Sequence, residues 1–371
     1  MIQRLFVHNY RCFANFELEL ANRSSVLVIG DDGAGKSTLG NALRLLQTIA
    51  QGKNRTRELL SSDDFSSHQP EGPLRIELSA IIDEERFEYG LKLTMPKNFR
   101  EPKVEEEFLK IDQRVIFRRS EADMEVAIDS TSFLLDWHFV ALPVVYIRGV
   151  PQRSMDKFRN WLARSIIISP VPARFSEESD SESFEPTPGV DNFAAWFSGI
   201  LGEYPAAYNT IADYLKIMMP DFLDVQNRTT GETTKRIVAR FEKNGRIFPT
   251  GLMRLSDGEK IFFLTALILA VNKHHGPVLC FWDEPDNYVS LSEVGRITTE
   301  IRKSFLSSGN GQILMASHNP EAIRSFTDES TVILTRRNHL EPTRVQWLSN
   351  CPFTGDLVNA LIREDFSDGV E

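Results

Sequence analysis

Cysteine is scarce in this sequence, and no two cysteines lie close together. The 371 residues include three of them, Cys12, Cys280 and Cys351, and they form no C-x-x-C pair. A cysteine zinc site and a disulfide framework both need recognisable cysteine spacings, so this sequence excludes them. Such cysteine usage is typical of a reducing compartment, and we expect a cytoplasmic protein.

Long apolar segments are also missing. The longest apolar run, residues 261–271, is about half as long as a bilayer-spanning helix needs to be. The first residues, MIQRLFVHNYRCF, lack the cationic-then-apolar pattern of a secretory signal. We therefore expect no association with a membrane.

The chain has no excess of positive charge. It carries 42 Lys and Arg against 52 Asp and Glu, a formal net charge of −10. This balance excludes wholesale wrapping of nucleic acid, but it allows a local basic groove. Two stretches, 146–164 and 226–246, each have a net charge of +4. These stretches predict a solvated face or a surface that binds a partner protein. The alternative is a site that binds the nucleic-acid backbone.

Sustained heptads and internal repeats are absent, which excludes a long coiled-coil arm. An acidic tract rich in Ser and Pro, residues 176–188, interrupts the middle of the chain. Its composition predicts a solvated or disordered loop.

The N-terminal part of the chain contains strand and helix patterns. Apolar segments bounded by polar or turn residues predict strands at 2–8, 16–20 and 26–29. Apolar residues at helical spacing then predict a helix over 36–49. The polar residues 52–72 predict a surface excursion.

The middle of the chain has a mixed pattern. Alternating apolar residues predict an antiparallel hairpin over 74–82 and 87–93, joined by another strand at 115–118. From 133 to 225 the pattern is helical and irregular, and a short β segment follows near 236–248.

The C-terminal part returns to alternating helix and strand. The expected order is helix 259–273, strand 278–282, helix 291–306, strand 312–316 and strand 331–334. This alternation favours a parallel sheet with helices on both faces. We predict an α/β core split between the ends of the chain, with an antiparallel β subdomain and an inserted helical lobe. The expected divisions are 1–132, 133–250 and 251–371.

The strongest motif is a phosphate-binding loop. Residues 30–37, GDDGAGKS, match G-x-x-x-x-G-K-[ST] between a strand and a helix. Backbone N–H groups and the helix N-terminus make such a loop an anion site. We expect Lys36 to reach the β- and γ-phosphates of ATP and Ser37 to ligate Mg²⁺. The predicted nucleotide-binding residues of this segment are Gly30, Asp32, Gly33, Gly35, Lys36, Ser37 and Thr38.

Two adjacent acids follow an apolar strand. Residues 278–284, VLCFWDE, are typical of a strand buried on both faces. Its end would lie at the carboxyl edge of the sheet, where ligands bind in α/β folds. We expect Asp283 to hold Mg²⁺ and Glu284 to act as general base on the attacking water.

Two further motifs carry candidate residues. LSDGEK, residues 255–260, opens the apolar helix, and it predicts either a simple helix cap or a second phosphate clamp formed by Ser256, Gly258 and Glu259. The clamp would act on the nucleotide of a second copy of the chain. SHNP, residues 317–320, follows a strand, and His318 is a candidate sensor of the γ-phosphate.

The order of these four motifs resembles the ABC-type ATPase head of the SMC, RecF and OLD branch, in the subset of small prokaryotic defence ATPases. The resemblance implies a homodimer, or a higher homo-oligomer, that closes around two ATP–Mg²⁺. It also implies that Arg11 reaches the nucleotide and that Asp286 and Asn287 form the D-loop. Tyr288 and Val289 stand where relatives often have an aliphatic-His pair. The Q-loop glutamine stays open among Gln69, Gln113 and Gln152.

The resemblance predicts a slow ATP-hydrolysing switch for a separate effector, such as a nuclease or toxin, in anti-phage defence. Because 53 residues follow His318 in this sequence, we expect no Toprim nuclease of the kind that OLD proteins have. A RecF-like DNA-repair ATPase is the alternative, and a transporter subunit is disfavoured because LSDGEK and DEPD differ from the transporter forms.

Overall fold

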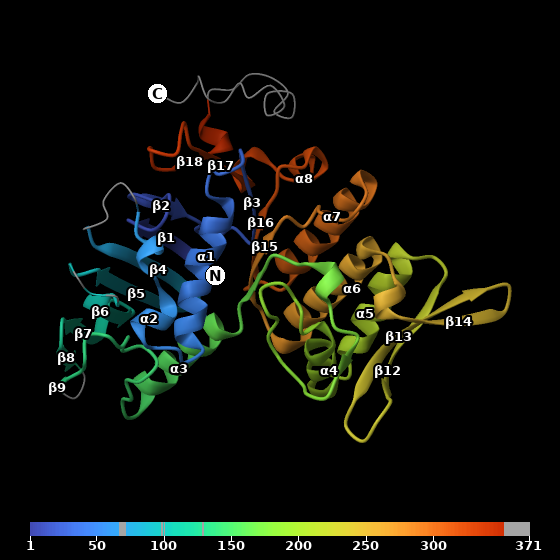
Figure 1. The fold of residues 1–371 in the computed structure, drawn as a ribbon, viewed down its shortest axis with the longest axis horizontal. Coiled ribbons are helices and arrows are strands. Elements are labelled where there is room, and N and C mark those ends of the chain that lie inside the picture. Colours follow the sequence, from blue (N-terminus) through green and yellow to red (C-terminus); the bar gives the residue numbers. More distant parts are fainter. Residues whose placement is uncertain (67–71, 98, 100, 128–129, 352–371) are drawn as a thin grey trace. The chain divides into compact units, whose positions relative to one another are not determined.

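A computed structural model describes the chain except residues 67–71, 98, 100, 128–129 and 352–371. The chain forms two compact units (Figure 1). The first unit is Met1–Ser165 with Asp328–Glu371, and the second is Ile166–Thr327. Among the described residues, no helix is both long and apolar enough to cross a bilayer.

An eight-stranded, antiparallel sheet dominates the first unit. Its order is β2-β1-β4-β5-β6-β7-β8-β9. The expected hairpin is confirmed, with Leu78 opposite Tyr89. Asp83 and Glu84 at its tip both have positive φ, as the tight turns of twisted hairpins require. The strands are β1 (Ile2–His8), β2 (Phe16–Glu19), β4 (Leu74–Ile82), β5 (Glu85–Thr94), β6 (Lys103–Ile111), β7 (Arg114–Ser120), β8 (Asp123–Val126) and β9 (Thr131–Leu134).

One strand of this sheet differs from the prediction. The strand expected at 115–118 is present as β7, but β6 lies between it and the hairpin. The β6 sequence, KVEEEFLKI, hides its alternation because Glu107 takes an inward position and is buried together with Leu109 and Ile111. A carboxylate at a core position removes the apolar signal that would have predicted the strand.

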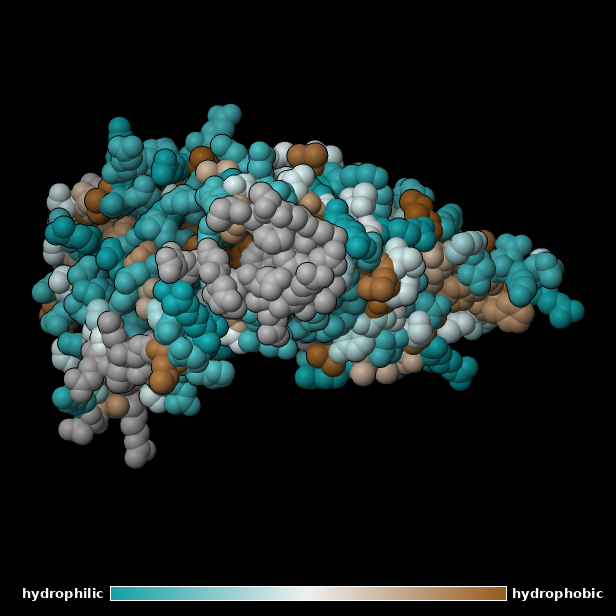
Figure 2. Space-filling view, turned by 90° about the horizontal axis from the view of Figure 1, so that it is seen from above, coloured by the Kyte–Doolittle hydropathy of each residue, from teal (hydrophilic) through white to brown (hydrophobic). Residues whose placement is uncertain are grey.

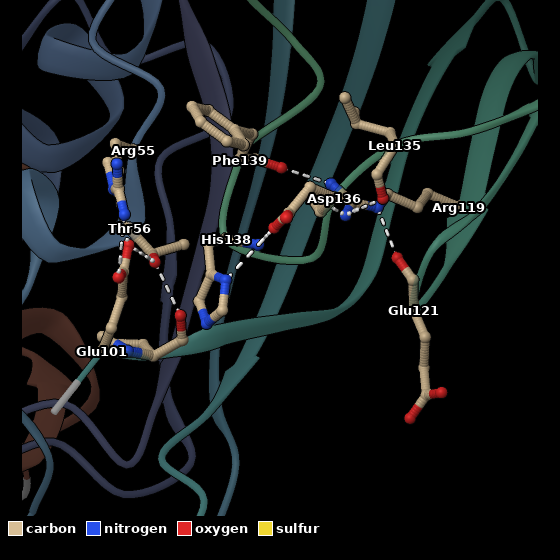
Figure 3. Close-up of polar contacts among 10 residues, drawn as sticks. Arg55, Thr56, Glu101, Arg119, Glu121, Leu135, Asp136, His138 and Phe139 are labelled. Carbon is tan, nitrogen blue, oxygen red and sulfur yellow. Dashed lines mark hydrogen bonds and ion pairs between the residues drawn. The ribbon is translucent and has the colours of Figure 1, made fainter. Parts of the chain in front are cut away.

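Two buried charged side chains, Arg119 and Glu107, hold the connection between β9 and the next helix, and Figure 3 shows the contacts of Arg119. Arg119 on β7 donates to the carbonyl oxygens of Leu135 at 3.0 Å and Asp136 at 2.7 Å, and also to that of Phe139. Glu107 accepts backbone N–H bonds from the neighbouring residues 141 and 142 at 2.6 and 2.8 Å. Residues 135–142 are therefore fastened to the sheet interior.

The same connection is bonded to the segment that follows the first helix. The Thr56 N–H donates to the His138 carbonyl at 2.9 Å, and the Val140 N–H donates to the Asn54 carbonyl at 2.8 Å. Arg55 pairs with Glu101 at 3.0 Å nearby (Figure 3). These bonds join two loops that are far apart in sequence.

The rest of the first unit supports the phosphate-loop segment. Strand β3 (Ser25–Gly30) pairs parallel with β17 (Thr331–Thr335), which pairs antiparallel with β18 (Arg344–Trp347). The expected helix is present as α1 (Lys36–Ala50), and it packs against α3 (Val150–Ala163). A short helix, α2 (Thr56–Leu59), lies within the predicted surface excursion.

The second unit contains parallel strands and helices. Strand β15 (Leu279–Asp283) is buried throughout, as its apolar sequence predicts, and it pairs parallel with β16 (Gln312–Ala316). On its other edge lies β10 (Ile166–Ile168), also parallel. This strand corrects the expectation of helical and irregular structure over 133–225, because three apolar residues are too short a run to show a period. The helices are α4 (Phe193–Glu203), α5 (Ala207–Met218), α6 (Asp257–Ala270), α7 (Leu291–Ser307) and α8 (Pro320–Arg324).

A small antiparallel sheet replaces the short β segment expected near 236–248. It is formed by β12 (Phe222–Thr229), β13 (Lys235–Lys243) and β14 (Arg246–Gly251). Ile247 and Phe248 on the β13–β14 hairpin are half exposed. Figure 2 shows this apolar surface, with hydrophilic residues at the hairpin tip, at the right of the view.

The acidic tract 176–188 is partly exposed to solvent and has defined partners, which agrees with the expected solvated loop and not with the disordered alternative. Its residues Glu178 and Ser179 form β11, which pairs with β13. The Glu177 carboxylate contacts Arg236 at 2.5 Å and accepts the Met253 N–H at 2.8 Å. Basic partners from a distant strand fix the tract, and composition alone does not reveal them.

Candidate nucleotide site

The phosphate loop connects β3 to α1, as the motif predicts. Gly30 ends the strand, and a Cβ there would lie 2.3 Å from the Leu334 carbonyl oxygen. Gly35 caps α1 with φ of +107°, where a Cβ would lie 2.9 Å from Cys12 Sγ. Only glycine fits these two positions, since one faces backbone and the other adopts a left-handed conformation.

Lys36 lies across the loop and is buried. Its Nζ donates to the carbonyl oxygens of Gly30 at 2.6 Å and Asp31 at 3.1 Å. The nearest carboxylate on the loop, that of Asp32, is 4.0 Å away and fully exposed, so it neutralises the ammonium only weakly. The first turn of α1 holds no acid. A positive side chain and an uncompensated helix N-terminus suit a phosphate group.

The next residues of α1 differ in exposure. Ser37 is exposed at the helix start, which fits a hydroxyl that would ligate a cation. Thr38 is half-buried, and its hydroxyl lies 3.5 Å from Cys12 Sγ. Arg11 lies in the turn before Cys12, and its guanidinium pairs with Asp64 at 2.9 Å. Its predicted contact with the nucleotide stays a prediction.

One contact to this loop has no sequence signal. The Thr343 hydroxyl donates to the Ala34 carbonyl at 2.8 Å, and the Thr343 N–H donates to the Cys12 carbonyl at 2.9 Å. Thr343 is buried and lies more than 300 positions after the loop. Sequence reasoning missed it because no local pattern marks a threonine before a short strand.

In the second unit, the acid pair ends β15. Asp283 is buried, and Glu284 has a left-handed φ of 55°. The Glu284 N–H donates to the Ala316 carbonyl at 2.8 Å, and its Oε2 accepts from Asn287 Nδ2 at 2.5 Å. A non-glycine residue in this conformation costs conformational energy, and such residues cluster at functional sites.

The loops after β15 and β16 are joined by side chains. The Ser317 hydroxyl donates to the Asp286 carboxylate at 2.5 Å and accepts the Asn319 N–H at 3.0 Å. His318 lies between these residues and is exposed. The predicted D-loop and the predicted γ-phosphate sensor are therefore brought together.

The LSDGEK segment forms the N-terminus of α6. Ser256 caps the helix by accepting the Glu259 N–H at 3.3 Å, and the Glu259 carboxylate accepts the Ser256 N–H at 2.7 Å. This reciprocal pair is a capping box, the simpler of the two predicted roles. A Cβ at Gly258 would lie 3.0 Å from the Tyr288 carbonyl oxygen, so the helix end also lies against the D-loop.

Several Lys and Arg residues of the two basic stretches are paired with acids. In 226–246, Lys235 contacts Glu182 at 2.6 Å, Arg236 contacts Glu177 and Arg240 contacts Asp224. In 146–164, Lys157 pairs with Glu85 and Arg159 with Asp156. The local excess of positive charge is reduced in the fold, which does not favour binding to a phosphate backbone.

Comparisons with known proteins agree with this arrangement. A family model described as "AAA domain, putative AbiEii toxin, Type IV TA system" matches residues 25–324. No curated protein matches this chain. An Smc head bound to the C-terminal winged-helix domain of ScpA is 13% identical, with a TM-score of 0.59 over 94% of this chain and 98% of that one.

A second solved structure, an Smc head domain with an extended coiled coil bound to the C-terminal domain of ScpA derived from Pyrococcus furiosus, is 11% identical. Its TM-score is 0.59, over 99% of this chain and 100% of that one. These two likenesses show the predicted fold, an SMC-type ABC ATPase head with an antiparallel subdomain, while the family match covers most of the chain. The chain belongs to this AAA-domain family and is an ATP-binding P-loop ATPase with the fold of an SMC head.

Proposed function

We propose that this protein is a slow ATP-hydrolysing switch that dimerises head to head around two ATP–Mg²⁺ and controls a separate effector in prokaryotic anti-phage defence. The observation that carries the proposal is the phosphate loop. Its Lys36 ammonium is held by loop carbonyls and is only weakly neutralised by the exposed Asp32. A triphosphate would offer that ammonium stronger acceptors than the carbonyls do.

We assign the chemical steps to residues of the phosphate loop and of the loops that follow β15 and β16. Lys36 binds the β- and γ-phosphates, while Ser37 and Asp283 are the oxygen ligands for Mg²⁺, which when bound neutralises phosphate charge. Glu284 takes a proton from the attacking water, and His318 responds to the γ-phosphate. The exposed position of His318 beside the D-loop supports the sensor role.

The second subunit supplies the N-terminus of its helix α6, where LSDGEK lies. Ser256 and Gly258 stand at the exposed N-terminus of α6, and in their own chain the Ser256 hydroxyl is engaged by Glu259 at 2.7 Å. We infer that a partner's γ-phosphate competes with Glu259 for this hydroxyl. Removal of the γ-phosphate by hydrolysis then removes the bridge between subunits. Assembly into a higher homo-oligomer is compatible with this head-to-head contact.

We attribute the slow turnover to a hydrogen bond on the proposed general base, Glu284. The Glu284 carboxylate accepts a short hydrogen bond from Asn287. This bond fixes the carboxylate within its own turn. Release of that bond on dimer closure would be required before the base can act, which suits a switch better than a metabolic catalyst.

A protein is the favoured target of the switch. Lys235, Arg236 and Arg240 of the stretch 226–246 are engaged by carboxylates, so a protein effector fits this surface better than DNA does. The family description, which names a toxin and a type IV toxin–antitoxin system, supports an effector of the nuclease or toxin class.

The proposal is tested by trapping the closed state. Glu284→Gln protein should shift from monomer to dimer when ATP and Mg²⁺ are added, as measured by light scattering. Lys36→Ala protein is the control and should stay monomeric under the same conditions. A Glu284→Gln protein that binds ATP but remains monomeric would contradict the dimer model.

A further inference from the structure

The connection between β17 and β18 reaches the phosphate loop through one side chain. Thr343 is 4% exposed, and its hydroxyl donates to the Ala34 carbonyl at 2.8 Å. Its backbone N–H donates to the Cys12 carbonyl at 2.9 Å. Thr343 therefore links the loop to the turn that packs against Gly35.

Thr343 is itself held in place by its neighbours. Arg344 begins β18 opposite Thr335, so strand pairing fixes the residue that follows Thr343. The connection before it is closed by Arg336, whose guanidinium donates to the carbonyl oxygens of His339 at 2.7 Å and Glu341 at 2.9 Å. A donor anchored on both sides can fix the orientation of the group that it contacts.

The contacted group belongs to the peptide between Ala34 and Gly35. No described peptide bond is cis. In a trans peptide the N–H points opposite to the C=O, so the direction of the Ala34 carbonyl sets that of the Gly35 N–H. Thr343 draws this carbonyl toward the protein interior, where its hydroxyl is buried. The Gly35 N–H is thereby directed away from Thr343.

We propose that Thr343 is a positioning residue for the triphosphate site, which keeps the Gly35 N–H directed toward the bound phosphates. This inference rests on the proposed binding of ATP at the phosphate loop. Without the hydroxyl, the peptide between residues 34 and 35 can rotate, and the loop loses a preorganised donor. The bond to phosphate exists both before and during hydrolysis, so its loss weakens binding more than turnover.

The test replaces the hydroxyl without changing the shape of the side chain. Thr343→Val should raise both the Kd for a fluorescent ATP analogue with Mg²⁺ and the KM for ATP by about five- to tenfold, with kcat within about twofold of the wild type. Thr343→Ser restores the donor and should return both constants to within about twofold of the wild type. If the valine variant does not fold, Thr343→Ala provides the same measurement.

Thr56 provides a matched control in the same unit. It is also a buried threonine, and its hydroxyl donates to the Pro102 carbonyl at 2.6 Å, away from the phosphate loop. Thr56→Val should lower the Tm as Thr343→Val does, yet leave the Kd and KM for ATP unchanged. If Thr343→Val and the wild type have equal Kd and KM values for ATP, the positioning role of Thr343 is wrong, and the proposed binding of ATP at the phosphate loop is unaffected. Failure of the wild type to bind ATP would overturn both proposals.

Discussion

The Glu284 carboxylate is held within its own turn, because its Oε2 accepts a hydrogen bond of 2.5 Å from Asn287 Nδ2. Glutamine has the same shape and keeps an oxygen that accepts this bond, so Glu284→Gln should preserve the turn. It cannot take up the proton of the attacking water. We expect ATP hydrolysis to fall by about 100-fold or more, with the Kd for ATP within about threefold of the wild type. Phosphate release and equilibrium binding measure the two effects, and near-normal turnover would show that another acid is the base.

The Asp224–Arg240 pair makes stability depend on pH. The hydrogen bond from Arg240 lowers the pKa of Asp224 below its usual value. Since the folded-state pKa is the lower one, this stabilisation is present above the unfolded pKa of about 3.9 and is lost as pH falls through the folded value. We expect Asp224→Asn to lower the free energy of unfolding by about 1 kcal/mol at neutral pH. Urea unfolding should show the difference vanishing near pH 2, and a constant difference at all pH values would contradict this.

Arg119 is predicted to be a major source of stability in the first unit. Its buried guanidinium donates to carbonyl oxygens of the 135–139 segment (Figure 3). The carboxylate of Glu107 is buried and interacts electrostatically with it. Arg119→Met leaves these acceptors unpaired and should lower the free energy of unfolding by about 3–5 kcal/mol. Arg118, its exposed neighbour on β7, is the control, and Arg118→Met should stay within about 0.5 kcal/mol of the wild type. Equal urea midpoints for the two variants would refute the role of Arg119.

Local patterns predicted much of this fold. The phosphate loop was predictable because its glycines, lysine and helix start lie within eight consecutive residues, 30–37. The β4–β5 hairpin was predictable because one face of each strand is buried, and burial of one face imposes a period of two. Strand β15 was predictable because its residues before Asp283 are all apolar.

Features that depend on distant partners were not predictable from those patterns. Glu107 occupies a core position because backbone donors from residues 141 and 142 satisfy its carboxylate. The acidic tract is ordered because β13 supplies Arg236. Thr343 contacts the phosphate loop only because β17 pairs with β3. In each case the partner is set by the fold, and hydropathy or composition cannot identify it.

The ion pairs of β13 predict weak binding to DNA. Lys235, Arg236 and Arg240 each contact a carboxylate, so few phosphate charges can be neutralised there. We expect no retention of duplex DNA in ATP, even at low salt, in a filter-binding or polarisation assay. Steep salt-dependent binding that disappears when these three residues are changed to Glu would instead favour the RecF-like alternative.

The composite site predicts complementation between two inactive proteins. Ser256→Arg protein should bind ATP but not hydrolyse it, because the bulky side chain stands where the partner's γ-phosphate would bind. Lys36→Ala protein should be inactive because it no longer binds the triphosphate well. A mixture with verified subunit exchange forms heterodimers that each have one intact site, and it should regain about a quarter to a half of wild-type turnover.

The control for this experiment is a second capping box in the same chain. Ser290 caps α7 as Ser256 caps α6. The Ser290 N–H donates to the Glu293 carboxylate at 2.8 Å, and the Ser290 hydroxyl donates to the same carboxylate at 2.7 Å. Ser290→Arg makes the same substitution at a helix cap outside the proposed phosphate clamp, so it should lose a similar amount of stability and keep its ATPase activity. If both arginine variants lose activity equally, the loss reflects damage to helix caps. Ser256 must act in trans if three results are found together. Ser256→Arg is inactive, Ser290→Arg is active, and the mixture of Ser256→Arg with Lys36→Ala regains turnover.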